Sequence, residues 1–362
     1  MTRRFIGHQA FKGRGAVSNP TVRFEKFNLE KAFDDWHQED LPARLSETVL
    51  PDSARSVITT NESPDVGFDK SINPYRGCSH GCVYCFARPS HAYLGLSPGL
   101  DFETKLFYKS DAANLLLAEL AKPKYRCSPI ALGINTDGYQ PLEKRLEVTR
   151  GILAVLTRYR HPVTIVTKSA LIVRDLDLLT DLAKDRLVSV MISITSLTAD
   201  IKRTLEPRAA SPEARLRTIQ RLSQAGVPTG VLLAPVIPAI TDHEMEHILS
   251  ASREAGATRA GYVLLRLPHE VKILFREWLA EHYPDRAKHV MSLIGQARGG
   301  KDYDAQFGVR MRGTGAYAEL LRRRFELARR KLGFDQSGDR HELNTALFRP
   351  PPADASQLTL GF

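Results

Sequence analysis

The sequence predicts an α/β fold built as an open or partial barrel of about six βα units. Two observations lead to this prediction. From Lys70 onward, short apolar runs typical of buried strands alternate with amphipathic stretches of helical period. The runs are apolar on both faces, which is typical of parallel strands covered by helices. Six units are too few for a closed eight-stranded barrel, so we expect a partial one.

The predicted elements follow one another along residues 70–267. The first strand lies near Ile72. Four strand–helix pairs come next, and one more strand ends the series. The strands are expected at 129–135, 163–167, 187–194, 230–235 and 261–266, and the helices at 146–159, 175–185, 212–225 and 242–255.

Segments of different character flank this core. Residues 1–70 are interrupted by glycines and prolines, which predicts an extension wrapped around the core rather than a domain. Residues 71–267 make up the core, and residues 268–334 form a helical, basic C-terminal region. Residues 335–362 form a polar tail that we expect to be flexible.

The composition excludes several classes of protein. Of the 362 residues, 43% are hydrophobic and 25% are charged, which is typical of soluble globular proteins. No apolar run is long enough for a membrane helix, and the first residues do not resemble a secretory signal. We therefore expect a cytoplasmic protein with no membrane partner. The net charge of +10 favours a polyanionic partner such as nucleic acid.

Three of the four cysteines lie close together, at Cys78, Cys82 and Cys85. Clustered thiols in a reducing compartment predict a metal site, and thiolates select iron–sulfur clusters or zinc. Three thiolates on a [4Fe–4S] cluster would keep one iron open for a substrate or cofactor. Gly77 and Gly81 would give the backbone room to bend around such a cluster.

Zinc is the alternative metal. His80 or Cys127 would complete a zinc knuckle, but a zinc ribbon normally has a second Cys/His pair at similar spacing, and the sequence has none. His243 and His247 fit the pattern H-E-x-x-H of zinc proteases. The apolar residues of that predicted helix form its core face, so we expect both histidines on a solvated surface.

The spacing C-x3-C-x2-C, with the aromatic Tyr84 before the last cysteine, resembles the signature of the radical S-adenosylmethionine (SAM) superfamily. Its place before a βα series matches the partial TIM-like barrel of those enzymes. In that superfamily the open iron chelates SAM, and reduction cleaves SAM to a 5′-deoxyadenosyl radical that abstracts hydrogen from the substrate. The resemblance implies a [4Fe–4S] cluster, SAM and a reducing electron donor such as flavodoxin or ferredoxin.

Within the superfamily, residues 71–267 are most similar to spore photoproduct lyase and related bacterial proteins. The lyase uses a cysteine as hydrogen-atom donor, but the matching position here is apolar, near Ile134. Cys127, seven residues earlier, is a candidate donor, and an inert free thiol is the alternative. The resemblance implies SAM contacts from Tyr84 in the cysteine motif and from the strand-end residues Thr136, Asp137, Lys168, Ser193 and Ala234.

The basic C-terminal region has its charge concentrated in residues 298–331, which hold ten basic and four acidic residues. Arginines interleaved with Tyr303, Phe307 and Tyr317 would bind phosphates and stack on bases. The alternative interpretation is a solvated helix face.

The last six residues form a second C-terminal feature. They resemble the peptide Q-L-x-L-x-F by which bacterial repair polymerases dock on the sliding clamp, with Gln357, Leu358, Leu360 and Phe362 as the contacts. The alternative is a tail that packs on its own domain.

Together these features predict a radical SAM enzyme that repairs or processes damaged DNA. Two alternatives stay open. One is radical SAM modification of RNA or protein, and the other is a zinc-containing nucleic-acid-binding protein without catalysis.

Overall fold

The computed structural model describes residues 11–24, 45–334 and 342–352. Its main sheet has the strand order β10-β9-β8-β7-β6-β3-β2, and all neighbours pair in parallel except β2 and β3. The six parallel strands of the predicted barrel are thus confirmed. They are β3 (Lys70–Ile72), β6 (Ile130–Leu132), β7 (Val163–Thr167), β8 (Val188–Ser193), β9 (Thr229–Val236) and β10 (Arg259–Leu264).

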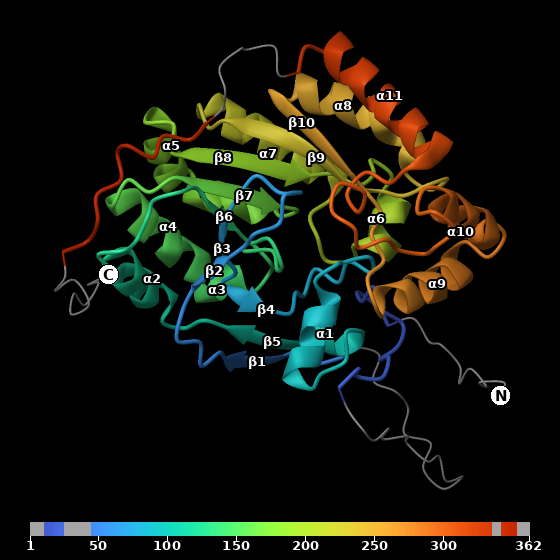
Figure 1. Ribbon diagram of the computed structural model, residues 1–362, viewed down its shortest axis with the longest axis horizontal. Helices are drawn as coiled ribbons and strands as arrows, with labels where there is room; N and C mark the ends of the chain where they lie inside the picture. Colours follow the sequence, from blue (N-terminus) through green and yellow to red (C-terminus); the bar gives the residue numbers. More distant parts are fainter. Residues whose placement is uncertain (1–10, 25–44, 335–341, 353–362) are drawn as a thin grey trace, which may run out of the picture.

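Helices follow the strands and cover the outer face of this sheet (Figure 1). Their caps are encoded locally. The Ser211 side chain accepts a hydrogen bond from the Ala214 backbone, and Pro212 occupies the first turn of α7. The covering helices are α2 (Ala112–Leu120), α4 (Val148–Arg158), α5 (Leu176–Lys184), α7 (Pro212–Gln224) and α8 (Met245–Glu254). The short helix α6 (Ala199–Leu205) packs instead against the C-terminal region.

The helix expected at residues 146–159 begins at Val148, as α4, and a separate short helix precedes it. Glu147 has a φ of 51°, a left-handed conformation that ends α3 (Glu143–Leu146) and precedes α4. The helices expected after β7 and β9 likewise begin with 3-10 turns. The 3-10 turns of the structure are η1 (Arg88–Leu94), η2 (Ala170–Asp175) and η3 (Asp242–Glu244).

The N-terminal extension contributes strands to both sheets. β2 (Ile58–Thr60) is the antiparallel edge strand of the main sheet. β1 (Thr48–Pro51) pairs with β5 (Lys105–Tyr108) in a second, three-stranded sheet that is completed by β4 (Tyr75–Arg76). The short helix α1 (Leu100–Thr104) directly precedes β5.

The C-terminal region contains α9 (Val271–His282), α10 (Ala287–Gln296) and α11 (Gly315–Lys331). Residues 297–314 are not helical, and the Leu264 N–H at the end of β10 donates to the Met311 carbonyl at 2.9 Å. α11 lies along α8 (Figure 1), joined by an Arg324–Glu246 ion pair of 2.7 Å. No helix of the described residues is long and apolar enough to cross a membrane.

Residues 342–352 pack against the core, so the prediction of a flexible tail is wrong for this segment. The Asn344 N–H donates to the Arg186 carbonyl, and the Arg349 N–H to the Tyr159 carbonyl, both at 3.0 Å. The Phe348 ring lies 5.1 Å from the His161 ring. Apolar burial of Phe348 supplies a driving force that the polar composition of the tail conceals. The clamp-like residues Gln357, Leu358, Leu360 and Phe362 lie outside the described residues.

Candidate functional site

A cavity of about 490 Å³ opens at the carboxyl ends of the parallel strands. Residues from β2 and from the ends of β6, β7, β8, β9 and β10 line it, together with the three clustered cysteines. The predicted site residues in the lining are Cys78, Cys82, Tyr84, Cys85, Asp137, Lys168, Ser193 and Ala234.

The cysteines lie on a loop, residues 77–87, that we call the cysteine loop. Gly77 has a φ of +75° and Gly81 a φ of +71°, conformations that favour glycine. A Cβ on Gly77 would lie 2.9 Å from the Phe102 carbonyl oxygen, and a Cβ on Gly81 would lie 2.8 Å from a Glu103 carboxylate oxygen. Both glycines are therefore required for the bend of the loop, as the sequence predicted.

Buried polar side chains hold the cysteine loop from behind. The Gln140 side chain accepts from the Ser79 N–H at 2.9 Å and donates to the Gly77 carbonyl at 3.2 Å. Arg88 donates to the Cys82 carbonyl at 2.9 Å and forms a fully buried ion pair with Glu103. The motif search did not detect Gln140, Arg88 or Glu103, because they hold backbone and carry no metal-ligand or cofactor pattern.

Glu103 also ties the N-terminal segment to the cysteine loop. Its carboxylate accepts from the backbone N–H groups of Gly15 at 3.1 Å and Ala16 at 2.8 Å. A Cβ on Gly15 would lie only 1.8 Å from the Gly81 carbonyl oxygen. Residues 14–16 therefore cover the cysteine loop at a distance that only glycine permits.

Asp137 organises the adjoining strand end. It accepts hydrogen bonds from the Thr167 hydroxyl at 2.7 Å and the Lys168 backbone N–H at 2.8 Å. Its carboxylate also lies 3.4 Å from the His80 ring. Burial lowers the pKa of His80 against the opposing attraction of Asp137, so this histidine is neutral near pH 7.

Tyr84 connects the cysteine loop to a buried ion pair. Its hydroxyl donates to Glu206, which also pairs with Arg215. Burial by itself would raise the pKa of Glu206, but Arg215 and Lys168 outweigh burial and lower that pKa to about 2. Lys168 stands over the Tyr84 ring, with its ammonium nitrogen 5.7 Å from the ring centre. Glu206 and Arg215 are further residues that the motif search did not find.

The remaining predicted SAM contacts differ in their position. The Ser193 hydroxyl donates to the Ala234 carbonyl at 3.1 Å, and both residues line the cavity. Thr136 is buried, and its hydroxyl donates to the Tyr75 carbonyl at 2.8 Å. Thr136 is not among the cavity-lining residues, so it supports the strand end rather than facing the cavity.

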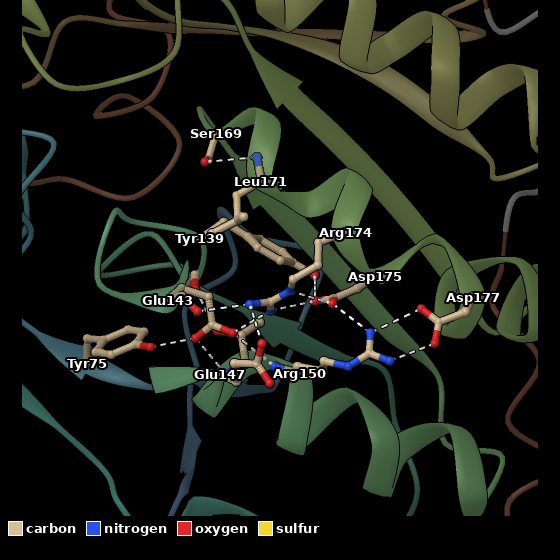
Figure 2. A network of polar contacts seen from close by, with 12 residues as sticks. Tyr75, Tyr139, Glu143, Glu147, Arg150, Ser169, Leu171, Arg174, Asp175 and Asp177 are labelled. Atoms are coloured by element: carbon tan, nitrogen blue, oxygen red, sulfur yellow. Dashed lines mark hydrogen bonds and ion pairs between the residues drawn. The ribbon is translucent and has the colours of Figure 1, made fainter. Parts of the chain in front are cut away.

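A buried network supports the loop that carries Asp137 and Gln140 (Figure 2). Asp175 accepts from the Tyr139 hydroxyl at 3.1 Å and from Arg150 and Arg174, each at 2.8 Å. Glu143 accepts from Arg174 at 2.7 Å. These contacts fix the polypeptide directly after β6.

Cys127 lies before β6, at the amino end of the strand, whereas the cavity opens at the carboxyl ends. It is not part of the cavity lining. The topology therefore places Cys127 away from the cysteine loop, which speaks against it as a fourth ligand or as a hydrogen donor.

The H-E-x-x-H histidines are exposed, as expected for a solvated surface. His243 and His247 flank Glu244, whose carboxylate accepts from the Ser196 hydroxyl and the Leu197 N–H, both at 2.6 Å. Glu244 therefore caps a turn instead of serving as a catalytic base.

Much of the basic charge in residues 298–331 is neutralised within the protein. Arg298 is 1% exposed and donates to backbone carbonyls. The Tyr317 hydroxyl donates to Asp242 at 2.7 Å. On α11, four of the arginines pair with glutamates, namely Arg322 and Arg323 with Glu319, Arg324 with Glu246, and Arg329 with Glu326. Glu319 and Glu326 are already counted in the sequence tally, but Glu246 lies outside residues 298–331, so the tally overstates the charge that a nucleic acid would meet.

The donor set fits an iron–sulfur cluster. Three cysteine side chains line one cavity on a glycine-bent loop. In the described part of the chain, no three His, Cys, Asp or Glu side chains converge tightly enough to hold a single metal ion. A cubane does not need such convergence, because each thiolate binds a different iron.

Comparison with known families agrees with this site. Residues 72–251 match the family model of the radical SAM superfamily. This part of the chain therefore belongs to the radical SAM superfamily, whose enzymes use a [4Fe–4S] cluster and SAM. The family and the cofactors predicted from the sequence are confirmed at that level.

Two relatives illustrate the range of similarity. An uncharacterized protein of Mycobacterium tuberculosis is 39% identical over 220 residues, which is 60% of this chain and 65% of that protein. An uncharacterized protein of Methanocaldococcus jannaschii is 26% identical over 215 residues, which is 59% of this chain and 76% of that protein. The match thus spans less than two thirds of the mycobacterial protein.

Among solved structures, spore photoproduct lyase has the same fold. Its complex with dinucleoside spore photoproduct has a TM-score of 0.56 at 13% identity, covering 79% of this chain and 80% of that one. A mutant of the same lyase has a TM-score of 0.55 at 16% identity with the same coverage.

Proposed function

We propose that the protein is a radical SAM enzyme that acts on damaged DNA. The observation that carries this proposal is the single cavity that brings Cys78, Cys82 and Cys85 together with the strand-end residues. The cysteines would hold a [4Fe–4S] cluster with one open iron. Once reduced, such a cluster would supply the electron for cleavage of SAM to methionine and a 5′-deoxyadenosyl radical.

The residues of the chain would orient SAM in this cavity. The Lys168 ammonium interacts with Glu206 only at long range and forms no ion pair within 4 Å among the described residues, so it can pair with the SAM carboxylate. The Tyr84 ring offers an apolar face whose position is fixed by its hydroxyl bond to Glu206. The Ala234 carbonyl and the Ser193 hydroxyl would contact the ribose and adenine side.

DNA is the proposed substrate because the structurally similar lyase binds a dinucleoside photoproduct. A damaged base in a duplex must be extruded to enter a cavity at the carboxyl ends of the strands, which costs a few kcal/mol. Attraction between the DNA phosphates and the cationic side chains of the cavity wall would offset part of that cost. An electron donor such as flavodoxin or ferredoxin would complete the system.

Anaerobic incubation of the reduced protein with SAM and ultraviolet-irradiated DNA tests this function. We expect 5′-deoxyadenosine together with altered bases. Formation of 5′-deoxyadenosine with unchanged DNA would reject DNA as substrate and favour RNA or protein. If anaerobic reconstitution gives a protein that contains no iron, the proposed radical SAM activity is rejected and the zinc alternative is favoured.

Lys168→Ala should weaken SAM binding while leaving the cluster in place. The change removes a charge-assisted contact worth roughly 1.5–3 kcal/mol, which is about ten- to a hundred-fold in affinity. Calorimetry on the reconstituted protein measures the loss. Lys184→Ala is the control, because Lys184 is 75% exposed on α5. Equal SAM affinity in both variants would show that Lys168 does not contact SAM.

Deletion of residues 357–362 should abolish binding to the bacterial sliding clamp, which we propose as a partner through the terminal peptide. We expect only micromolar affinity, about −7 to −8 kcal/mol, because a linear peptide loses entropy when it binds. The deletion spares the packed segment 342–352, so melting temperature and iron content should not change. Undetectable clamp binding by the full chain in surface plasmon resonance would remove this partner.

A further inference from the structure

One wall of the cavity is built from two segments that are distant in sequence. The chain around β2 contributes Ser63 and Phe68, and the chain after β10 contributes Arg266, Arg310 and Met311. β2 and β10 are the two edge strands of the sheet. This wall therefore spans the open side of the partial barrel.

An ion pair holds the two segments together. Asp65 accepts from the Gly308 backbone N–H at 2.6 Å and pairs with Arg310. Arg310 also donates to the Ser63 hydroxyl. The charge of Arg310 is thus used within the protein, and the wall has a fixed shape.

Arg266 lines the same cavity, but it is not paired with a carboxylate in the way that Arg310 is. Among the described residues, it forms no ion pair within 4 Å, although it lies near enough to Asp65 to interact with that carboxylate at longer range. Its contacts are the Tyr303 hydroxyl at 3.3 Å and the Met311 sulfur at 3.7 Å. Its Nε atom is buried with no hydrogen-bond partner. The two terminal nitrogens, whose protein contacts are long, are therefore the donors that remain for a bound anion.

Phe86 lies directly beside Arg266, with the guanidinium carbon 5.0 Å from the ring centre. Phe86 lines the cavity and is 39% exposed, although it immediately follows the last cluster cysteine, Cys85. An exposed ring with a cation over it provides both a stacking surface and a phosphate ligand.

The other charged groups in the lining already have partners or assigned roles. Asp137 is the one carboxylate of the described lining, and it accepts backbone and hydroxyl hydrogen bonds. Lys168 is assigned to the SAM carboxylate, and Arg310 pairs with Asp65. Arg266 is the cation that remains for a substrate anion.

We propose that Arg266 binds a backbone phosphate of the nucleic-acid strand whose damaged nucleotide enters the cavity, with Phe86 against the adjoining base. This inference rests on the proposed function and assigns the contact that would hold the substrate. A guanidinium binds a phosphate through two parallel hydrogen bonds, which the two terminal nitrogens of Arg266 would donate.

A phosphate scan tests the contact. The probe is a fluorescein-labelled six-nucleotide oligothymidylate with an ultraviolet photoproduct at its two central bases, in which each phosphate in turn is replaced by an uncharged methylphosphonate. Fluorescence anisotropy measures its binding to the protein with its cluster and SAM. For the parent protein, we expect one replacement to weaken binding about ten-fold or more, as for loss of a charge-assisted bond.

In Arg266→Gln, that same replacement should have no further effect. The slope of log affinity against log salt should also fall by about 0.7, the value for one contact to a single strand. Arg266→Lys should keep the slope and lose part of the affinity, because lysine keeps the charge but not the two-bond geometry. Arg203→Gln is the control, since Arg203 is 77% exposed on α6.

Two results would overturn the inference in distinguishable ways. If Arg266→Gln, folded and with full iron content, responds to every replacement as the parent does, Arg266 makes no phosphate contact. That result would not contradict the proposed activity on damaged DNA. If the parent cleaves SAM but binds no oligonucleotide, both the phosphate contact and the DNA substrate are wrong.

Discussion

Cys82→Ala should abolish the bound cluster and with it all SAM cleavage. Cys82 lies in the cysteine loop, and its carbonyl is held by Arg88 whatever the side chain is. The backbone should therefore keep its shape, and the loss should come from the missing thiolate. Two thiolates do not hold a [4Fe–4S] cluster securely, because the cluster then has two irons without a protein ligand.

Iron and sulfide analysis after anaerobic reconstitution measures this effect. Cys127→Ala is the matched control, because Cys127 precedes β6 at the opposite end of the sheet. It should keep the iron and sulfide content of the parent. Near-stoichiometric iron in Cys82→Ala would contradict the ligand set, and loss of iron in Cys127→Ala would identify a fourth protein ligand.

Asp175→Ala should destabilise the fold by about 3 kcal/mol. Asp175 is fully buried and accepts hydrogen bonds from Arg150, Arg174 and Tyr139 (Figure 2). Its removal leaves the buried Tyr139 hydroxyl without its acceptor and deprives two guanidinium groups of a shared counter-charge. The loop with Asp137 follows β6 in the same network, so SAM affinity should fall as well.

Asp177→Ala provides the comparison for Asp175→Ala. Asp177 pairs with the same Arg150 at 2.7 Å, but its side chain is 56% exposed. An exposed ion pair is worth at most about 1 kcal/mol, so this variant should unfold near the parent midpoint. Urea unfolding of both variants gives the two free energies. Equal destabilisation would show that burial of the carboxylate does not control the strength of this network.

The local pattern of the sequence determined the barrel and the cluster loop. Six apolar runs at βα spacing predict six parallel strands because buried strands must be apolar on both faces. The order C-x3-C-x2-C identifies Cys78, Cys82 and Cys85 because all three ligands lie within one short loop. Lys168 and Asp137 were assigned from the resemblance to spore photoproduct lyase, and both line the cavity where the strand ends of the parallel sheet meet.

Tertiary structure decided which charges are available and what covers the site. Two ion pairs, Arg324–Glu246 and Arg310–Asp65, depend on which helices and loops pack together. A sequence tally cannot show this, because ion pairs join residues far apart in the chain. In the same way, Gly15 covers the cysteine loop and Phe348 packs beside His161 only because the folded core provides complementary surfaces.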